Sequence, residues 1–147
     1  MAQTEKIIDT MRRFGQFYTV SLGTLDQNYL GTGFSVTEMR LIFEMDWHSG
    51  IRAAELAQRL RLDKSYISRI IRSFEKRGLI TRTQSPTDGR TFALALTPAG
   101  KAASNALLAA VHQNISRLLA PLSEESQEEV AQAMERIMEI FEKESTT

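Results

Sequence analysis

Residues 53–96 of the chain read AAELAQRLRLDKSYISRIIRSFEKRGLITRTQSPTDGRTFALAL. The spacing of apolar residues predicts a short helix over residues 53–60. Asp63 is a favourable N-cap for a second helix that runs to about residue 77, and Gly78 follows it at the position where glycine commonly ends a helix. The sequence therefore predicts two helices joined by a very short turn.

The second of these helices has a sharply divided surface. At 100° per residue its apolar side chains fall on one arc, which holds Tyr66, Ile67, Ile70, Ile71 and Phe74. The opposite arc is entirely polar and holds Lys64, Ser65, Ser68, Arg69, Arg72, Ser73 and Lys76. We expect the apolar arc to face a core and the polar arc to face solvent or a partner.

Two short strands are predicted next, over residues 79–83 and 91–96, with a turn at SPTDG between them. Their buried face is expected to consist of Phe92, Leu94 and Leu96. Two helices and a short turn followed by a hairpin make a winged helix-turn-helix. The predicted fold class is therefore mainly α with a small β-hairpin wing.

The polar arc of the second helix suits the major groove of DNA, which admits one α-helix and is read by hydrogen-bond donors and acceptors. Ser65, Ser68, Arg69 and Arg72 supply such groups, and Lys64 near the helix start is placed for a phosphate. A solvated basic face on an ordinary amphipathic helix is the alternative that periodicity alone leaves open.

The hairpin tip adds Asp88-Gly89-Arg90. An arginine on a protruding turn can enter a narrow A·T-rich minor groove, where negative potential is concentrated. Asp88 would then orient the Arg90 guanidinium through a charge-assisted hydrogen bond. Asp-Gly is also an ordinary turn-forming pair, so a purely structural role stays open.

Four further helices flank this region. They are expected over residues 5–29, 35–47, 97–119 and from 123 to about 141, with residues 142–147 as a frayed tail. Ser35 and Glu38 form the pattern of a capping box, bracketed by Phe34 and Met39. Thr97-Pro98 and Ser123 are further helix-start signals.

The outer helices carry wide apolar stripes that a domain this small covers poorly by itself, so we expect a homodimer. The predicted organisation is an N-terminal dimerisation helix in residues 1–34, a winged helix-turn-helix in residues 35–96 and C-terminal dimerisation helices in residues 97–147.

The charge distribution fits a DNA-binding centre. The 147 residues have zero net charge, yet residues 52–90 contain 10 Lys and Arg against 4 Asp and Glu. No cysteine is present, which excludes disulfides and thiolate metal sites within this chain. No membrane span or signal peptide is evident, and a cytoplasmic location is expected.

Catalysis by this chain is not expected, because no nucleophile-base-orienter set and no glycine-rich phosphate loop occurs. His48 and His112 stand alone, so no metal site and no cofactor is predicted. Tyr18, Trp47 and His48 are candidates for a ligand crevice. The alternative, that they are core aromatics at the junction between the dimer helices and the DNA-binding domain, is the more common situation.

The motifs at residues 61–83 and 88–100, including the Asp-x-Arg wing and the Leu-Thr-x-x-Gly segment, resemble the MarR family of winged-helix repressors. The resemblance covers about residues 10–141. It implies interlocked homodimers that place one helix per subunit in successive major grooves of a palindromic operator, with wings in the minor groove. It assigns Lys64, Ser65, Ser68, Arg69 and Arg72 to that helix and Asp88 with Arg90 to the wing.

Segments 12–19 and 34–45 look closest to the regulator half of MarR-type proteins fused to an acetyltransferase. Arg61 departs from the family pattern, which often has glycine in the turn. If Arg61 adopts a left-handed conformation, the strain is about 1 kcal/mol. The expected function is a DNA-binding repressor, with release by a small-molecule effector as an added option. The alternative is a regulatory or interaction module of an acetyltransferase system that lacks specific DNA binding.

Overall fold

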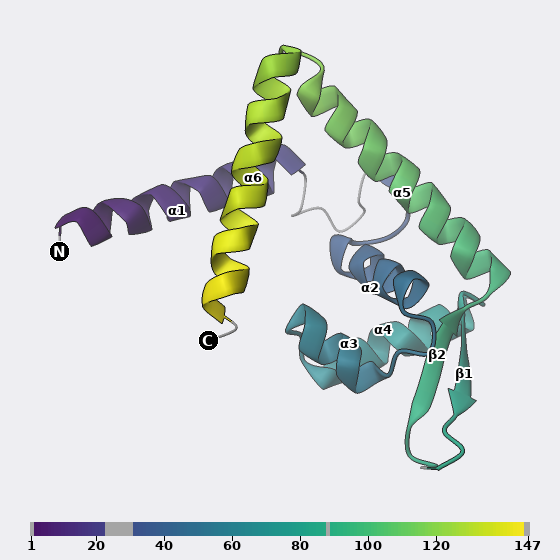
Figure 1. Cartoon of the computed structure of the whole chain (residues 1–147). Coiled ribbons are helices and arrows are strands. Elements are labelled where there is room, and N and C mark those ends of the chain that lie inside the picture. The colour runs from purple at the N-terminus through teal and green to yellow at the C-terminus, as the bar shows by residue number, and fades with distance from the viewer. Residues whose placement is uncertain (1, 23–30, 88, 146–147) are drawn as a thin grey trace. The chain divides into compact units, whose positions relative to one another are not determined.

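A computed structural model describes residues 2–22, 31–87 and 89–145 of the chain. Its elements follow in the order α1 (Ala2–Leu22), α2 (Val36–Trp47), α3 (Ala53–Leu60), α4 (Lys64–Lys76), β1 (Ile80–Gln84), β2 (Phe92–Leu96), α5 (Pro98–Leu119) and α6 (Glu124–Ser145) (Figure 1). The predicted fold class, mainly α with a small β-hairpin, is confirmed.

The chain divides into two compact units, residues 1–111 and 112–147. The first unit contains the hydrophobic core, to which α2, α3, α4, the hairpin and the first part of α5 contribute. The largest side chains that are almost completely buried are Leu41, Ile42, Met45, Leu56, Ile67, Phe74, Leu94 and Leu107. None of the described helices is long and apolar enough to cross a membrane.

Helix α2 begins as the capping box predicts. The Glu38 backbone N–H donates to Ser35 Oγ over 3.1 Å, and the Ser35 N–H donates to Glu38 Oε1 over 2.8 Å. Phe34 and Met39 on either side of this turn are buried. Two otherwise unsatisfied donors are paired in this way, which fixes the point where the chain enters the core.

The turn between α3 and α4 depends on Arg61, which adopts a left-handed conformation with φ 53° and ψ 49°. It is the only non-glycine residue with positive φ in the described ranges. The Leu62 N–H donates to the Ala57 carbonyl over 3.0 Å and closes the end of α3. Asp63 holds the N-cap position of α4 as predicted, but its side chain makes no capping hydrogen bond.

The hairpin pairs β1 and β2 antiparallel, with Ile80 opposite Leu96 and Gln84 opposite Phe92. Ile51 forms an isolated bridge to Leu94, so a third, single-residue strand segment fastens the base of the hairpin. The predicted buried face is only partly buried, because Leu94 is enclosed while Phe92 and Leu96 keep some exposure.

Helix α5 starts where Thr97 caps it. Thr97 Oγ1 accepts from the Gly100 N–H over 3.1 Å and donates to the Gly78 carbonyl over 2.6 Å. A Cβ added to Gly100 would lie 2.1 Å from the Leu79 carbonyl oxygen. Only glycine therefore allows α5 to approach the end of α4 and the start of β1 this closely.

The first and last helices differ from their predicted bounds. Helix α1 begins three residues earlier than expected, and the continuation towards residue 29 lies outside the described residues. Residues 142–145, expected to fray, continue α6. Glu142, Lys143 and Glu144 are good helix formers, which favours this extension. The division into residues 1–34, 35–96 and 97–147 by role stays a prediction.

Candidate nucleic-acid interface

The exposed face of α4 carries the five residues that the sequence singled out. Lys64, Ser65, Ser68, Arg69 and Arg72 are all exposed. The opposite face contributes Ile67, Ile70, Ile71 and Phe74 to the core. No apolar side chain interrupts the polar face, so the helix presents an unbroken row of donors and acceptors.

The second half of α4 borders a shallow open hollow of about 720 Å³. Its lining consists of Arg69, Arg72, Ser73, Glu75, Lys76 and Arg77. Arg77 is fixed at the rim, because its guanidinium lies 4.3 Å from the centre of the Phe34 ring and its Nη1 lies 3.9 Å from Glu38 Oε2. Four cations against one carboxylate give this end of the helix an excess of positive charge.

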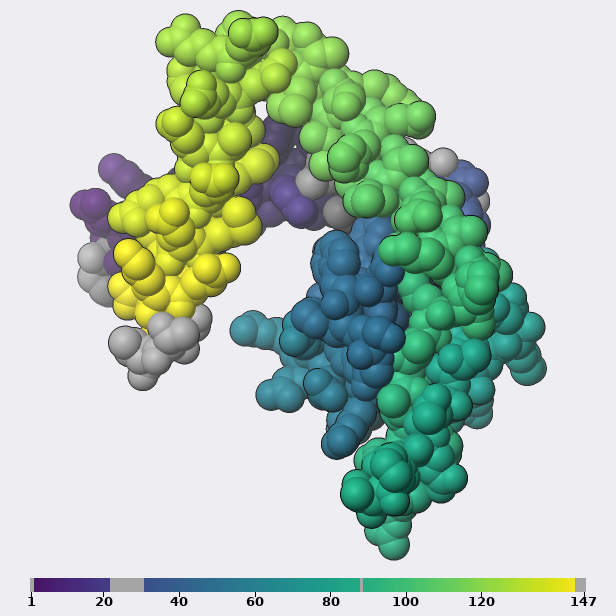
Figure 2. Space-filling view, turned by 45° about the vertical axis from the view of Figure 1, so that its right-hand side comes forward, coloured from purple at the N-terminus to yellow at the C-terminus, as the bar shows by residue number. Residues whose placement is uncertain are grey.

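The hairpin projects from the helices of its unit (Figure 2). Arg90 is exposed near the tip, and the Gln84 side-chain amide donates to the Gly89 carbonyl over 2.9 Å. Asp88 lies outside the described residues, so its predicted hydrogen bond to Arg90 stays a prediction. The described part of the tip is nonetheless braced by Gln84.

Two arginines that sequence reasoning did not single out share a groove with the predicted site residues. Arg52 precedes α3 and Arg82 lies in β1, and both line a groove with Ser68 of α4 and Arg90 of the wing. The alternation of residues along the strands could have pointed to Arg82. It lies opposite Leu94, and residues opposite each other in a hairpin point to the same face, so Arg82 lines the groove together with Leu94. For Arg52 the only signal in the sequence is that the residue belongs to the basic segment 52–90.

Arg82 is held firmly. Its Nε donates to Glu75 Oε1 over 2.7 Å, and its guanidinium lies 5.6 Å from the centre of the Phe92 ring. The contact joins α4 to β1 of the hairpin through a charged pair.

A second polar link joins α2 to α5. The Lys101 ammonium donates to both carboxylate oxygens of Asp46, over 2.8 and 3.0 Å, and the buried Ser104 hydroxyl donates over 2.8 Å. The hydrogen bond from Lys101, and then that from Ser104, lower the pKa of Asp46 below its ordinary value. The carboxylate therefore stays ionised and ties the start of α5 to the core.

The three ligand candidates are only partly brought together. Trp47 is 65% exposed and stacks on Phe43 with ring centres 5.6 Å apart, and His48 follows it directly. Tyr18 contacts Phe14 instead, at 6.3 Å. Neither Trp47 nor Tyr18 is a core residue within the single chain.

His48 belongs to a polar cluster at the end of α2. His48 Nε2 lies 3.3 Å from Arg59 Nη1, and Arg59 Nη1 lies 3.5 Å from Glu44 Oε2. Glu44 Oε2 is buried and has no hydrogen-bond partner among the described residues. The described ranges contain no group of three His, Cys, Asp or Glu residues placed to hold a metal ion.

Comparison with known proteins identifies this architecture. Residues 34–92 match the model of the MarR family. A Thauera aromatica protein named "Putative transcriptional regulatory protein for hcr operon" is 37% identical over 68 residues, which are 46% of this chain and 39% of that protein. The chain thus spans well under half the length of this relative.

Two further comparisons extend over more of the chain. The HTH-type transcriptional repressor Rv2887 of Mycobacterium tuberculosis is 26% identical over 105 residues, covering 71% of this chain and 76% of that protein. Its crystal structure, a complex with salicylic acid, has a TM-score of 0.65 at 23% identity, covering 87% of this chain and 93% of that one.

A probable transcriptional regulator from Pseudomonas aeruginosa has a TM-score of 0.67 at 28% identity, covering 92% of this chain and 98% of that one. The proteins named here are described as transcriptional regulators or repressors. Residues 34–92 thus match the MarR family, and the solved proteins with this fold include transcriptional regulators.

Proposed function

We propose that the protein is a cytoplasmic transcriptional repressor that binds a palindromic operator as a homodimer. The observation that carries this proposal is the unbroken polar face of α4, flanked by the basic hairpin. In this proposal Ser65, Ser68, Arg69 and Arg72 contact base edges, and Lys64 contacts a phosphate.

Exposed apolar rows on the outer helices support the homodimer. Helix α1 leaves Ile7, Met11, Phe14 and Phe17 about half exposed or more, and α6 does the same with Phe141. Burying such rows against a second copy is strongly favourable. Residues 1–34 and 97–147 would then serve dimerisation, and residues 35–96 would serve DNA binding.

Selection from a random duplex library with the purified full-length protein tests the proposal. We expect enriched sites with inverted symmetry and half-site centres about 10 bp apart. A pool without an enriched sequence would contradict specific DNA binding, and an enriched site without symmetry would contradict the dimeric arrangement.

Individual roles can then be separated on the selected site. Arg69→Ala or Arg72→Ala should relax base preference and cost about 1–3 kcal/mol per base contact, whereas Lys64→Ala should weaken all duplexes alike.

Arg90→Ala should flatten the salt dependence of binding, and Asp88→Ala should weaken specific binding with little change in that dependence. Equal losses on selected and random duplexes for Arg69→Ala would contradict its role in base reading.

We also propose release from DNA by a small aromatic acid. The relative Rv2887 was solved with salicylic acid. Here the exposed Trp47 directly precedes His48, whose Nε2 lies 3.3 Å from Arg59 Nη1. A flat ring could stack on Trp47 while its carboxylate pairs with Arg59. Titrating salicylate into the protein-duplex complex should lower the affinity for DNA in the wild type and not in Trp47→Ala.

A further inference from the structure

Three guanidinium groups from three different segments converge on one groove of about 390 Å³. Arg52 comes from the start of α3, Arg82 from β1 and Arg90 from the end of the turn. The remaining lining is uncharged and consists of Ala53, Ala54, Ser68, Ile71, Thr91, Phe92 and Leu94. Among the described residues the lining contains no carboxylate, so the groove suits an anion.

Arg82 is prepared for such a ligand. Glu75 engages its Nε and Nη2, and the Phe92 ring lies beside the guanidinium plane. No described group bonds to the third nitrogen, Nη1. A guanidinium held by a carboxylate on one edge keeps its direction, so it loses little conformational entropy when a phosphate binds at the other edge.

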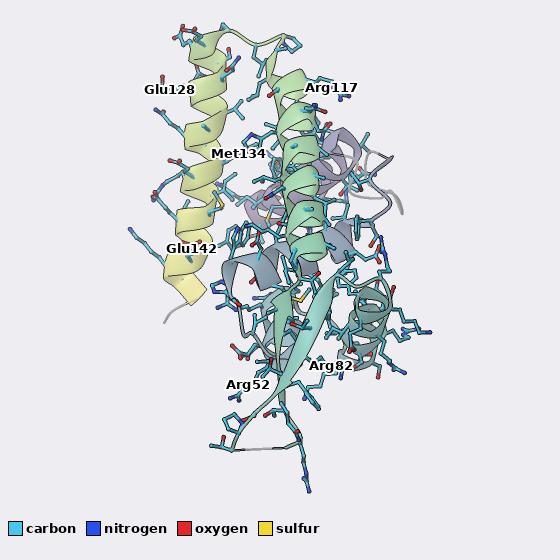
Figure 3. The ribbon with its side chains drawn as sticks, turned by 90° about the vertical axis from the view of Figure 1, so that its right-hand side faces the viewer. Arg52, Arg82, Arg117, Glu128, Met134 and Glu142 are labelled. Atoms are coloured by element: carbon cyan, nitrogen blue, oxygen red, sulfur yellow. The ribbon has the colours of Figure 1, made fainter. Side chains whose placement is uncertain are left out.

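Arg52 differs because no described residue pairs with its charge. Its backbone N–H donates weakly to Glu55 Oε1 over 3.4 Å, but its guanidinium forms no hydrogen bond or ion pair with a described residue. Both Arg52 and Arg82 lie beside the hairpin, above its tip (Figure 3). The groove thus contains Arg82, whose guanidinium is held by Glu75, and Arg52, whose guanidinium has no partner among the described residues.

The position of the groove specifies its occupant. A helix in the major groove and a wing in the adjacent minor groove of one duplex must have one sugar-phosphate strand between them, because that strand is the wall separating the two grooves. The groove lies between Ser68 on the exposed face of α4 and Arg90 on the wing.

We propose that this groove binds a backbone phosphate of the DNA strand that passes between α4 and the wing, with Arg52 and Arg82 as its ligands. The inference rests on the proposed function. The phosphate fixes the register of the protein on the duplex and carries no sequence information, so both arginines act on selected and random duplexes alike.

The test measures duplex affinity of the full-length protein over a series of salt concentrations. Arg52→Gln and Arg82→Gln should each flatten the slope of log K against log salt by about 0.9 for every phosphate contact that is lost. A dimer loses one such contact in each subunit, so the total change should be about 1.8. Arg40→Gln is the matched control, because Arg40 is an exposed arginine of α2 outside the groove. Its slope should equal that of the wild type.

A second measurement locates the phosphate. Methylphosphonate replaces one phosphate at a time along the selected site, which removes a single negative charge. At the phosphate between the helix-contacted bases and the wing-contacted minor groove, the neutral substitution and Arg52→Gln should be non-additive, since each removes the same contact. Full additivity at every position would overturn the proposal.

Arg82→Gln also breaks the pair with Glu75 and could disturb the hairpin, so Glu75→Gln and melting curves accompany it. Glu75→Gln breaks the same pair but keeps the cation, and its salt slope should stay at the wild-type value or steepen. If Glu75→Gln flattened the slope as much as Arg82→Gln does, the effect would come from the position of the hairpin. That result would contradict a phosphate contact by Arg82.

Failure of the inference is distinguishable from failure of the proposed function. Wild-type binding to a selected site with unchanged salt slopes in both arginine variants would overturn the phosphate site alone. No enriched site in the selection would overturn the proposed function. Inorganic phosphate at constant ionic strength should leave the melting temperature unchanged, and a rise that Arg52→Gln abolishes would indicate a free-anion site instead.

Discussion

Helices α4 and α6 are both amphipathic, yet the chain buries the apolar face of α4 and leaves that of α6 exposed. In α4 the apolar side is enclosed, and Phe74 has no exposed surface. In α6 the large apolar side chains keep between 36% and 58% of their surface, from Val130 to Phe141. Amphipathicity therefore shows that a face needs a cover, but it does not tell whether the cover comes from the same chain.

The difference separates two kinds of stability. The unit formed by residues 1–111 contains the core that holds α4 and the hairpin, and its stability should depend little on protein concentration. The apolar face of α6 gains burial only when something else covers it. Changes in the two helices should accordingly affect folding in one case and association in the other.

The largest expected effect is that of Phe74→Ala. The Phe74 ring is fully buried and meets Phe34 edge-on at 6.4 Å, so its removal leaves a cavity. We expect a loss of about 3–5 kcal/mol in the free energy of unfolding. Denaturant titration at two protein concentrations measures it, and a loss below about 1 kcal/mol would contradict the enclosed core around α4.

Phe141→Ala is the matched change in α6. Since Phe141 is 58% exposed in the single chain, the unfolding of the core should be unaffected. Association of two chains should weaken by roughly 1.5–3 kcal/mol for each ring withdrawn from contact. Sedimentation equilibrium measures the dimer constant. An unchanged constant would remove this face of α6 from the dimer interface.

Asp46→Asn tests the polar link between α2 and α5. It removes a carboxylate that accepts three hydrogen bonds, and we expect a loss of roughly 1–2 kcal/mol at neutral pH, discounted for the exposed Lys101 side chain. Asp9→Asn, in an exposed pair with Arg12 and Arg13, is the control and should shift stability by less than about 0.5 kcal/mol.

The same carboxylate gives a pH dependence with a definite sign. The pKa of Asp46 is lower in the folded protein than its ordinary value of 3.8, so the folded state binds fewer protons there. Its contribution to stability is complete above that ordinary value and is lost as the pH falls through the lower folded value. Below about pH 4 the stabilities of wild type and Asp46→Asn should converge, and a constant difference down to pH 2 would contradict this.

The smallest expected effect is that of Arg61→Gly. A left-handed conformation strains any side chain beyond glycine, so the substitution should stabilise the protein by about 0.5–1 kcal/mol. Thermal melting measures the change. A destabilised variant would show that the Arg61 side chain makes a stabilising interaction that outweighs the strain.

Local signals predicted local structure well. The capping box of Ser35 and Glu38, the cap at Thr97 and the divided face of α4 each depend on spacings of at most a few residues, and all three occur in the structure. The left-handed conformation of Arg61 was raised only as a condition, from the glycine that MarR-family proteins often have at this place, and the structure shows it.

Long-range contacts could not be predicted in the same way. The pairing of Asp46 with Lys101 joins residues 55 positions apart, and Arg52 reaches its groove only because β1 and β2 pack beside α3 and α4. Asp63 occupies the N-cap position of α4 as predicted, but its side chain does not form the hydrogen bond that usually accompanies this position. What covers an exposed apolar side chain such as Phe141, which is 58% exposed, lies beyond what the sequence of one chain can show.

The hairpin is fastened unevenly along its length. At its base the Gly50 N–H donates to the Leu94 carbonyl, the Leu94 N–H to the Ile51 carbonyl and the Thr97 N–H to the Leu79 carbonyl, each over 2.9 Å. Towards the tip, β1 has no buried residue after Ile80. The free energy of local opening should therefore fall from base to tip, and amide hydrogen exchange should quicken in the same order. In the proposed complex, a hairpin fastened in this way would adjust its end to the width of a DNA groove at little energetic cost, while α4 would keep its position.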